Sequence, residues 1–266
     1  MMKPLVSVII PSFNRYEFLK NAIDSVKNQT YENLEIIVIN DCSTDERYYD
    51  KNNFENVLLI NLEQNQKEKY GFGPGAVRNF GIDNAKGKYI AILDADDESL
   101  PQRLSTQSYA LQEKSISLIA SNANLIDVKG MKFGQTDFPV SHEELVLNLL
   151  NLKPFPHSSV MFRRDIMEEL GGYNERCQKS IDYNFYLELI QADKRIHCLE
   201  ENLINLRRYP GSWGVSDQKS LQFFYGFLGL VAYFVYKRNN INLMRIDKQK
   251  FEVIEGLLSK WFYSSS

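Results

Sequence analysis

Short runs of apolar residues, many of them β-branched, alternate along the first part of the chain with segments whose apolar positions recur at helical spacing. Residues 5–10, 34–39 and 57–60 have the length and composition of buried strands. Between the first two we predict a helix, capped by Asn14 with Glu17, whose apolar face is formed by Phe18, Leu19, Ala22, Ile23 and Val26. This order of elements predicts right-handed βαβ units, and therefore an α/β fold with a mostly parallel central sheet flanked by helices.

Elements of both kinds continue along the rest of the chain at less regular spacing. A polar loop is predicted over 61–70, followed by a helix through 76–82 that stops before Gly87 and by a strand over 89–93. The remaining predicted elements are a helix from about 101, a strand over 117–128, a helix capped by Ser141 and Glu144, an extended segment over 154–162, a helix over 164–170 ended by Gly171 and Gly172, a helix starting at Asp182, and an extended edge segment over 196–206.

The composition changes after Gly211. Residues 221–236 are almost wholly apolar and aromatic, and Lys237 and Arg238 follow them directly. Such a helix is shorter than the roughly 18 residues that a membrane-spanning helix needs. Two interpretations remain open: the helix packs in the core or against a second copy of the chain, or it lies in a membrane interface.

The overall composition limits the class of protein. The chain of 266 residues is 44% hydrophobic and 24% charged, which predicts a substantial core. A net charge of −3 gives no reason to expect a nucleic-acid partner. The three cysteines, Cys42, Cys177 and Cys198, lack metal-ligand spacing, and their odd number argues against a disulfide framework. Because a strand begins almost at once and no signal segment precedes it, a cytoplasmic protein is expected.

A cluster of carboxylates follows the most apolar strand. Asp94, Asp96 and Asp97 come directly after the run 89–93, at the carboxyl end of the strand, where open α/β sheets place their functional groups. Three carboxylates in four positions repel one another unless a cation or hydrogen-bond donors neutralise them. A divalent metal that holds a phosphorylated substrate would do so. The alternative is the acidic first turn of a helix that begins near Pro101, which would explain Asp97 more easily than the other two.

A glycine-rich segment, 71–75 (GFGPG), precedes the predicted helix at 76–82. A dinucleotide-binding fingerprint follows a strand directly, whereas a polar loop intervenes here and the glycine spacing is wrong. A loop that closes over a ligand and ordinary turn chemistry are the two interpretations that remain.

Three stretches at predicted strand ends carry a resemblance to a known family. They are 6–15 (VSVIIPSFNR), 40–45 (NDCSTD), and Arg78-Asn79 with 85–97 (AKGKYIAILDADD). In this order they resemble the family 2 inverting glycosyltransferases, which have a GT-A fold. The resemblance covers about residues 4–105 and continues more loosely through 157–164, 171–173 and 182–183. It implies a GT-A domain over 1–210, with a nucleotide-binding half at about 1–105 and an acceptor half at about 106–210, and a C-terminal helical extension over 211–266.

The resemblance also implies an activity and a set of donor-binding residues. Members of this family transfer a sugar from a nucleotide diphosphate sugar, usually a UDP-sugar, to an acceptor hydroxyl. Asp41 matches a carboxylate that accepts the uracil ring N–H, with a loop-capping aspartate as the alternative. Pro11 matches the turn that packs against the nucleoside, and Arg78 matches an arginine near the donor, with a solvated helix face as its rival. Asp94 matches a residue that faces the ribose or a metal-bound water, and Asp96 matches the ligand of Mn²⁺ or Mg²⁺.

The acceptor side is implied in the same way. Asp182 falls where the family places its general base, in an acidic pair after a Gly-Gly-aromatic turn, but Ile181 replaces the first acid. A helix-start aspartate without catalytic role is the alternative. Many relatives have a histidine where Tyr209 stands. His157 is left out of the catalytic set because a structural histidine is at least as common.

The expected function is an inverting, metal-dependent glycosyltransferase whose acceptor is a surface polysaccharide or lipid-linked oligosaccharide. By this interpretation the protein is cytoplasmic and contacts the inner face of the membrane through 221–236, unless that helix forms a homodimer. The alternative is an inactive sugar-nucleotide-binding or complex-forming subunit, suggested by Ile181 and Tyr209. A nucleotidyltransferase is discounted because no glycine-rich phosphate loop follows the first strand.

Overall fold

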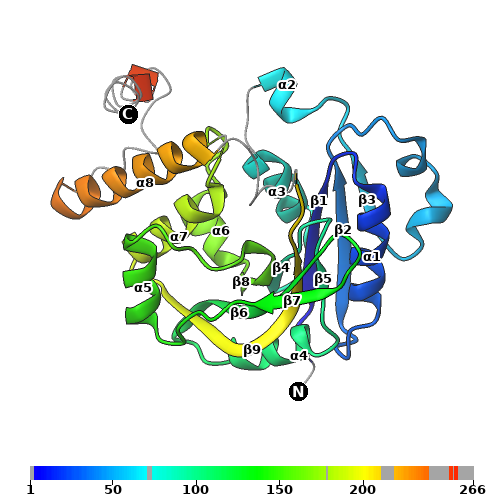
Figure 1. Cartoon of the computed structure of the whole chain (residues 1–266), viewed down its shortest axis with the longest axis horizontal. Helices are drawn as coiled ribbons and strands as arrows, with labels where there is room; N and C mark the ends of the chain where they lie inside the picture. The colour runs from blue at the N-terminus through cyan, green and yellow to red at the C-terminus, as the bar shows by residue number, and fades with distance from the viewer. Residues whose placement is uncertain are drawn as a thin grey trace.

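The structure is a computed structural model, and it describes residues 3–70, 74–177, 179–210, 219–239, 252–253 and 255–256. Its centre is one mixed sheet with the strand order β3-β2-β1-β4-β8-β6-β9-β5, to which β7 is added beside β6 (Figure 1). The strands are β1 (Val6–Ser12), β2 (Leu34–Asn40), β3 (Leu58–Asn61), β4 (Tyr89–Ile92), β5 (Glu98–Ser99), β6 (Ile116–Ile126), β7 (Lys132–Gln135), β8 (Met161–Arg163) and β9 (Arg195–Arg207). The α-helices are α1 (Tyr16–Lys27), α2 (Gln66–Tyr70), α3 (Pro74–Asp83), α4 (Arg103–Ala110), α5 (His142–Leu150), α6 (Asp165–Leu170), α7 (Ile181–Gln191) and α8 (Lys219–Asn239).

The half of the sheet formed by β3, β2, β1 and β4 is parallel throughout, as the βαβ pattern predicts. Alternate residues of β1 face opposite layers of helices. Val8 and Ile10 belong to the core that contains the apolar face of α1, whereas Ile9 belongs to the core that contains Val77 and Ile82 of α3. Both faces of these strands are therefore covered, which explains why their sequences are continuous apolar runs.

The other half of the sheet is mixed. The short strand β8 is antiparallel to both β4 and β6, and β6 runs parallel to β9 along most of its length. In Figure 1 the long strand β9 curves around the lower edge of the molecule. The prediction that 196–206 is an edge segment is wrong, because the two-residue strand β5 pairs with β9 on its far side, Glu98 opposite Asn205. A strand of two residues leaves no hydrophobic pattern in the sequence.

Local corrections fall mainly at the loops beside the first two strands. The helix α1 begins at Tyr16, and Asn14 is not its N-cap: Asn14 has a positive φ of 51°, and its side-chain oxygen accepts from the backbone N–H of Thr44. Pro11 lies within β1 instead of closing it, at a point where the pairing with β4 has already ended at Ile9. Part of the predicted polar loop 61–70 forms the short helix α2.

Other predicted elements are close to those observed. Ser141 caps α5, accepting from the N–H of Glu144 and donating to its carboxylate, and Gly171 ends α6 in the left-handed conformation. The segment 154–162, predicted as extended, includes a 3₁₀ turn at His157–Ser159 before β8. Two further 3₁₀ turns, Glu46–Tyr48 and Lys51–Phe54, follow β2.

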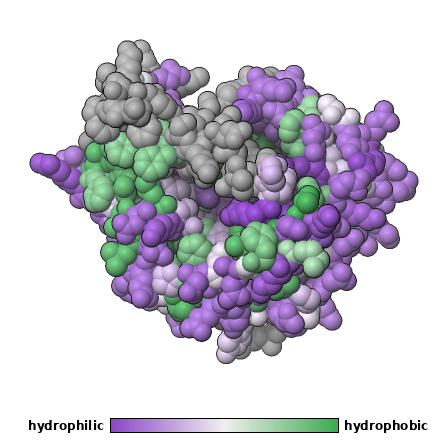
Figure 2. Space-filling model, viewed as in Figure 1, coloured by the Kyte–Doolittle hydropathy of each residue, from purple (hydrophilic) through white to green (hydrophobic). Residues whose placement is uncertain are grey.

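The apolar segment 221–236 forms most of α8, and one face of this helix lies in the main core. Phe224, Tyr225, Leu228 and Ala232 are buried with residues of α7. The outer face leaves apolar side chains exposed, including Phe223 (52%) and Phe234 (56%), and Figure 2 shows hydrophobic residues gathered over this region. Among the described helices, none is both long and apolar enough to cross a membrane. The glycine segment at 71–73 and most of the predicted extension 211–266 lie outside the described residues.

Gly87 precedes β4 in a space that no side chain can enter. A Cβ there would lie 2.6 Å from the backbone nitrogen of Ser7 and 2.9 Å from the carbonyl oxygen of Tyr89. We expect Gly87→Ala to lower the free energy of unfolding by about 2 kcal/mol or more, because backbone atoms of two strands would have to shift. Urea denaturation followed by circular dichroism measures this change. The control is Gly134→Ala, whose Cβ would make an ordinary 3.5 Å contact, and we expect it to stay within about 0.5 kcal/mol of the wild type. An equal, small effect of both substitutions would contradict the packing argument.

Candidate active site

The carboxyl ends of β1, β2 and β4 lie side by side in the sheet, and the predicted site residues follow them. Asp41 comes directly after β2, and Asp94 comes two residues after β4. Because β1 is paired with both of these strands, the loop after β1, which carries Arg15, lies between the other two. The parallel half of the sheet therefore brings the three predicted motifs to one edge, at the carboxyl ends of the strands, where open α/β sheets bind their ligands.

Asp94 is paired with Arg78. The Nη2 of Arg78, from α3, lies 2.5 Å from Asp94 Oδ1, and the guanidinium is almost fully buried. Desolvation raises the pKa of Asp94, but Arg78 and its other neighbours outweigh this effect and hold the pKa below its ordinary value. Arg78 Nε is buried and has no hydrogen-bond partner among the described residues. Arg78 is thus not on a solvated helix face, and it keeps a donor available beside the acidic strand end.

Asp96 is held from two sides. Its Oδ2 accepts from Arg15 Nη1 at 3.0 Å and from the Tyr209 hydroxyl at 2.8 Å. Burial, followed by the nearby charge of Asp94, raises the pKa of Asp96, and Arg15 counteracts this only in part. An additional positive charge beside the Asp96 carboxylate would therefore stabilise its ionised form.

Asp97, which has no assigned role in the sequence prediction, is fully buried and organises the loop. Its Oδ1 accepts from the backbone N–H of Arg207 at 2.8 Å, and its Oδ2 accepts from the Ser158 hydroxyl. The same Ser158 oxygen accepts from the backbone N–H of Asp94 at 3.0 Å. Ser158 and Asp97 therefore hold the backbone of the acidic loop, residues 94–97, in place through hydrogen bonds.

Two arginines complete this support. Arg207 Nε donates to the carbonyl of Asp96 at 2.9 Å, and its Nη2 pairs with Glu98 at 2.5 Å. Arg103 is wholly buried and donates through Nη2 to the carbonyl of Ile92 at 2.8 Å, at the end of β4. Burial lowers the pKa of Arg103 to about 9. Sequence patterns gave no signal for Arg207, because its partners Asp96 and Glu98 lie 111 and 109 positions away along the chain.

Asp41 is buried and both of its carboxylate oxygens are engaged. Oδ1 accepts from the backbone N–H of Gln66 at 2.9 Å, and Oδ2 accepts from the side-chain amide of Asn65 at 2.9 Å. Burial raises the pKa of Asp41 to about 6, although the N–H of Gln66 opposes the shift. Asp41 thus anchors the segment that begins α2. Because each carboxylate oxygen has two lone pairs, the group still has capacity to accept a further donor.

Asp182 lies in the first turn of α7, near the residues of the acidic strand end. Burial raises the pKa of Asp182, while the N–H of Tyr183 and the charge of Arg78 lower it and the charge of Asp94 raises it. Asp182 therefore lies close enough to Arg78 and Asp94 for their charges to act on its pKa. A carboxylate with a raised pKa in such a position is suited to proton transfer.

His157 is structural, in line with its exclusion from the catalytic set. Its Nδ1 and Nε2 are bonded to the hydroxyls of Tyr186 (2.7 Å) and Tyr173 (3.0 Å). Burial lowers the pKa of His157 to about 3, so the imidazole is neutral near pH 7. Both of its nitrogens are occupied within the core beneath the site.

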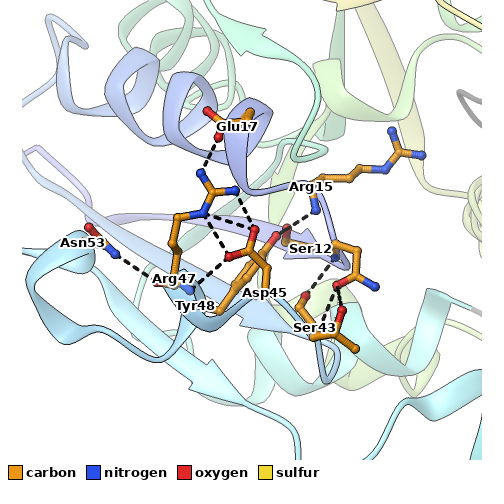
Figure 3. A network of polar contacts seen from close by, with 10 residues as sticks. Ser12, Arg15, Glu17, Ser43, Asp45, Arg47, Tyr48 and Asn53 are labelled. Atoms are coloured by element: carbon orange, nitrogen blue, oxygen red, sulfur yellow. Dashed lines mark hydrogen bonds and ion pairs between the residues drawn. The ribbon is translucent and has the colours of Figure 1, made fainter.

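The loops after β1 and β2 are tied together by a polar network (Figure 3). The Ser12 and Tyr48 hydroxyls are hydrogen-bonded to each other at 2.5 Å, and the Tyr48 hydroxyl also accepts from the backbone N–H of Arg15. Arg47, whose side chain is exposed, forms ion pairs with both Asp45 and Glu17. The side chain of Arg15 points away from this network (Figure 3), and its Nη1 donates to Asp96 Oδ2. The backbone at this edge is therefore rigidly supported, whereas the side chain of Arg15 extends into the site.

The donor set fits a divalent metal held by a single protein carboxylate. Within the described part of the chain, no three His, Cys, Asp or Glu side chains converge as a metal-binding group. Mg²⁺-type ions in nucleotide sites need only one or two carboxylates, because substrate phosphates and water complete the coordination. Asp94 is paired with the buried Arg78, whereas Arg15 offsets the burial of Asp96 and the charge of Asp94 only in part, so Asp96 is the better candidate for this role.

Comparisons with known proteins agree with this architecture. The chain matches the profile of glycosyl transferase family 2 over residues 7–171. It is 32% identical over 226 residues to an uncharacterised glycosyltransferase of Methanocaldococcus jannaschii, a match that covers 78% of this chain and 72% of that protein. It is also 32% identical over 213 residues to TuaG of Bacillus subtilis, a glycosyltransferase named for teichuronic acid biosynthesis, covering 77% of this chain and 79% of the relative. Other relatives are longer: the match takes up 34% of two Rickettsia proteins. The chain belongs to glycosyl transferase family 2.

Solved structures establish the fold. S. aureus TarS 1-349 in complex with UDP-GlcNAc superposes with a TM-score of 0.68 at 18% identity, covering 97% of this chain and 81% of that one. The mannosyltransferase PcManGT of Pyrobaculum calidifontis, in complex with GDP-Man and Mn²⁺, superposes with a TM-score of 0.63 at 16% identity, covering 98% and 70%. The predicted GT-A fold is confirmed.

Proposed function

We propose that this glycosyltransferase transfers a sugar from a UDP-sugar to an acceptor hydroxyl with inversion, with a divalent metal bound at Asp96 and Asp182 as the general base. The observation that carries the proposal is that three carboxylates, of Asp94 and Asp96 after β4 and of Asp182 in the first turn of α7, have different electrostatic environments. Asp94 is paired with Arg78. The pKa of Asp96 is raised because Arg15 only partly offsets burial and the charge of Asp94, and burial raises the pKa of Asp182. Groups whose environments separate their proton affinities in this way are suited to separate tasks.

The roles follow from what each group can do. The ionised carboxylate of Asp41 would accept the uracil N–H, and Pro11 at the end of β1 would pack against the nucleoside. Arg78 would lie near the sugar nucleotide, and its ion-pair partner Asp94 would face the ribose or a metal-bound water. Mn²⁺ or Mg²⁺ at Asp96 would stabilise the negative charge of the departing diphosphate as a Lewis acid. Asp182 would take the proton of the acceptor hydroxyl, which is a poor nucleophile near pH 7.

The acceptor class is proposed from the relatives. TuaG is named for teichuronic acid biosynthesis, which favours a surface polysaccharide or a lipid-linked saccharide as the acceptor. The exposed Phe223 and Phe234 of α8 would suit contact with an acceptor held at a membrane surface.

A donor screen tests the proposed reaction. The protein is incubated with UDP-GlcNAc, other UDP-sugars and GDP-Man, with Mn²⁺, and release of the nucleotide is measured by a coupled assay. We expect release from one or more UDP-sugars, and proton NMR of the product should show the inverted anomeric configuration. Tight UDP binding without turnover of any donor would favour the inactive subunit. Release from GDP-Man alone would contradict the assignment of Asp41 to uracil.

The ionisation of Asp41 predicts a pH dependence of UDP binding. Because burial raises the pKa of Asp41 to about 6, the carboxylate becomes protonated as the pH falls through that value, and the neutral acid accepts the ring N–H more weakly than the carboxylate does. We expect the UDP affinity of the wild type to fall below pH 6 relative to that of Asp41→Asn, and to exceed it above pH 7 by roughly tenfold, the effect of one hydrogen bond to a charged group. Calorimetry of both proteins across this range measures the ratio, which cancels the titration of the UDP phosphate. A ratio independent of pH would contradict the role of Asp41.

A further inference from the structure

Two side chains from distant parts of the sequence hold the same carboxylate oxygen. Arg15 follows β1 and Tyr209 follows β9, and both donate to Oδ2 of Asp96. The two donors also contact each other, with the Arg15 guanidinium 5.5 Å from the centre of the Tyr209 ring. We call these three residues, Arg15, Asp96 and Tyr209, the carboxylate latch.

The latch is not compatible with a metal ion bound on the same oxygen. A divalent cation on Asp96 would face the positive charge of Arg15 at close range, and at such distances the repulsion is substantial even near a protein surface. Arg15, the Tyr209 hydroxyl and the metal ion would also compete for one carboxylate oxygen, which has only two lone pairs. Binding of a metal at this oxygen therefore requires that Arg15 leave it, and the Tyr209 hydroxyl competes with the metal for the same lone pairs.

The side chain of Arg15 is able to leave while its backbone stays. The backbone N–H of Arg15 is fixed on the Tyr48 hydroxyl, and that of Asn14 on the Ser43 hydroxyl. The Arg15 side chain itself is 25% exposed and extends away from this support, as Figure 3 shows, to reach Asp96. Its position between the loop that carries Asp41 and the loop that carries Asp96 lies where a diphosphate joining the two sites would pass. A guanidinium is well suited to phosphate oxygens.

We propose that the carboxylate latch is a switch: Arg15 and Tyr209 occupy Asp96 before the donor arrives, and the metal and nucleotide diphosphate together displace them, with Arg15 moving from the carboxylate to the diphosphate. The latch thus suppresses binding of free metal and couples metal binding to donor binding. This inference rests on the proposed function, because it needs a metal–diphosphate ligand at the site.

Titration with Mn²⁺ alone, followed by electron paramagnetic resonance of the free ion, tests the switch without any turnover. We expect Arg15→Gln and Tyr209→Phe each to bind Mn²⁺ several-fold to about tenfold more tightly than the wild type, since each loses a competitor of the metal. Calorimetry with UDP in saturating Mn²⁺ should then separate the two variants. Arg15→Gln should bind UDP about tenfold more weakly, through loss of the phosphate contact, whereas Tyr209→Phe should bind it at least as tightly as the wild type.

The matched controls are Arg195→Gln and Tyr109→Phe, which alter an exposed arginine and an exposed tyrosine away from Asp96. We expect both to match the wild type. Unchanged or weaker Mn²⁺ binding by Arg15→Gln or Tyr209→Phe, with normal UDP binding by the wild type, would overturn the latch and leave the proposed function standing. Failure of the wild type to bind UDP with or without Mn²⁺ would overturn the proposed function itself.

Discussion

Replacement of Asp182 by asparagine is expected to lower kcat by about 100- to 10,000-fold, the range that a general base contributes, and to leave UDP affinity within about twofold. The amide has nearly the same shape as the carboxylate but cannot take the acceptor proton. The assay is steady-state release of UDP from the best UDP-sugar of the donor screen, with UDP calorimetry on the same preparation.

The matched control for this variant is Asp165→Asn. Asp165 also lies in the first turn of a helix, but it is exposed at the start of α6. An effect that arose only from the helix dipole would appear in both variants and would be small, about 0.3–1 kcal/mol. A large loss of UDP affinity in Asp182→Asn, or equal kcat values for the two variants, would contradict the assignment of Asp182 as base.

The raised pKa of Asp182 adds a pH dependence to this prediction. Burial favours the neutral acid, so the group becomes protonated, and inactive as a base, at a higher pH than an exposed aspartate. The wild-type kcat/KM should therefore fall as the pH decreases through the raised pKa and level off above it. In Asp182→Asn the residual rate should lack this acidic limb.

Replacement of Asp96 by asparagine is expected to abolish metal-dependent turnover, with a fall in kcat of about 1,000-fold or more, equivalent to about 4 kcal/mol of transition-state stabilisation. The amide is a poor ligand for Mn²⁺ or Mg²⁺ and cannot offset the charge of the departing diphosphate. The same assay, run over a range of Mn²⁺ concentrations, should show no metal-dependent increase in rate.

Two measurements separate this effect from a loss of folding. The ion pair of Asp96 with Arg15 is partly exposed, so the free energy of unfolding should change by about 1 kcal/mol or less. Asp24→Asn, on the exposed side of α1, should have wild-type kcat and the wild-type response to metal. A Mn²⁺-stimulated rate close to that of the wild type in Asp96→Asn would exclude Asp96 as the metal ligand.

The parallel half of the fold was predictable from sequence for a physical reason. Strands β1, β2 and β4 are covered on both faces, so each appears as an uninterrupted apolar run, and the helix between the first two has a regular apolar face. The strands β5 and β8 are only two and three residues long. Their pairing depends on partners far along the chain, which local patterns do not encode, and so the order of the second half of the sheet was not predictable.

The site shows the same division. Asp94 and Asp96 were singled out because they follow a buried strand at its carboxyl end, and Asp41 was singled out by the resemblance of 40–45 to the family. Their supporting contacts were not recognised, since Ser158 and Arg207 reach Asp97 across 61 and 110 positions. The prediction that Asn14 caps a helix, made from its spacing to Glu17, is wrong. Asn14 has a positive φ, and its side chain accepts from the backbone N–H of Thr44 in the neighbouring loop. A tertiary contact outweighed a local preference.

The central claim is that the edge of the sheet at β1, β2 and β4 binds a UDP-type donor together with a metal at Asp96. The most direct test is calorimetric titration of the wild type and Asp96→Asn with UDP, GDP and CDP, each with and without Mn²⁺. The proposed function predicts that UDP binds best, that Mn²⁺ strengthens its binding to the wild type, and that this gain is absent in Asp96→Asn. Binding of no nucleotide by the wild type, or an equal gain from Mn²⁺ in both proteins, would contradict the claim.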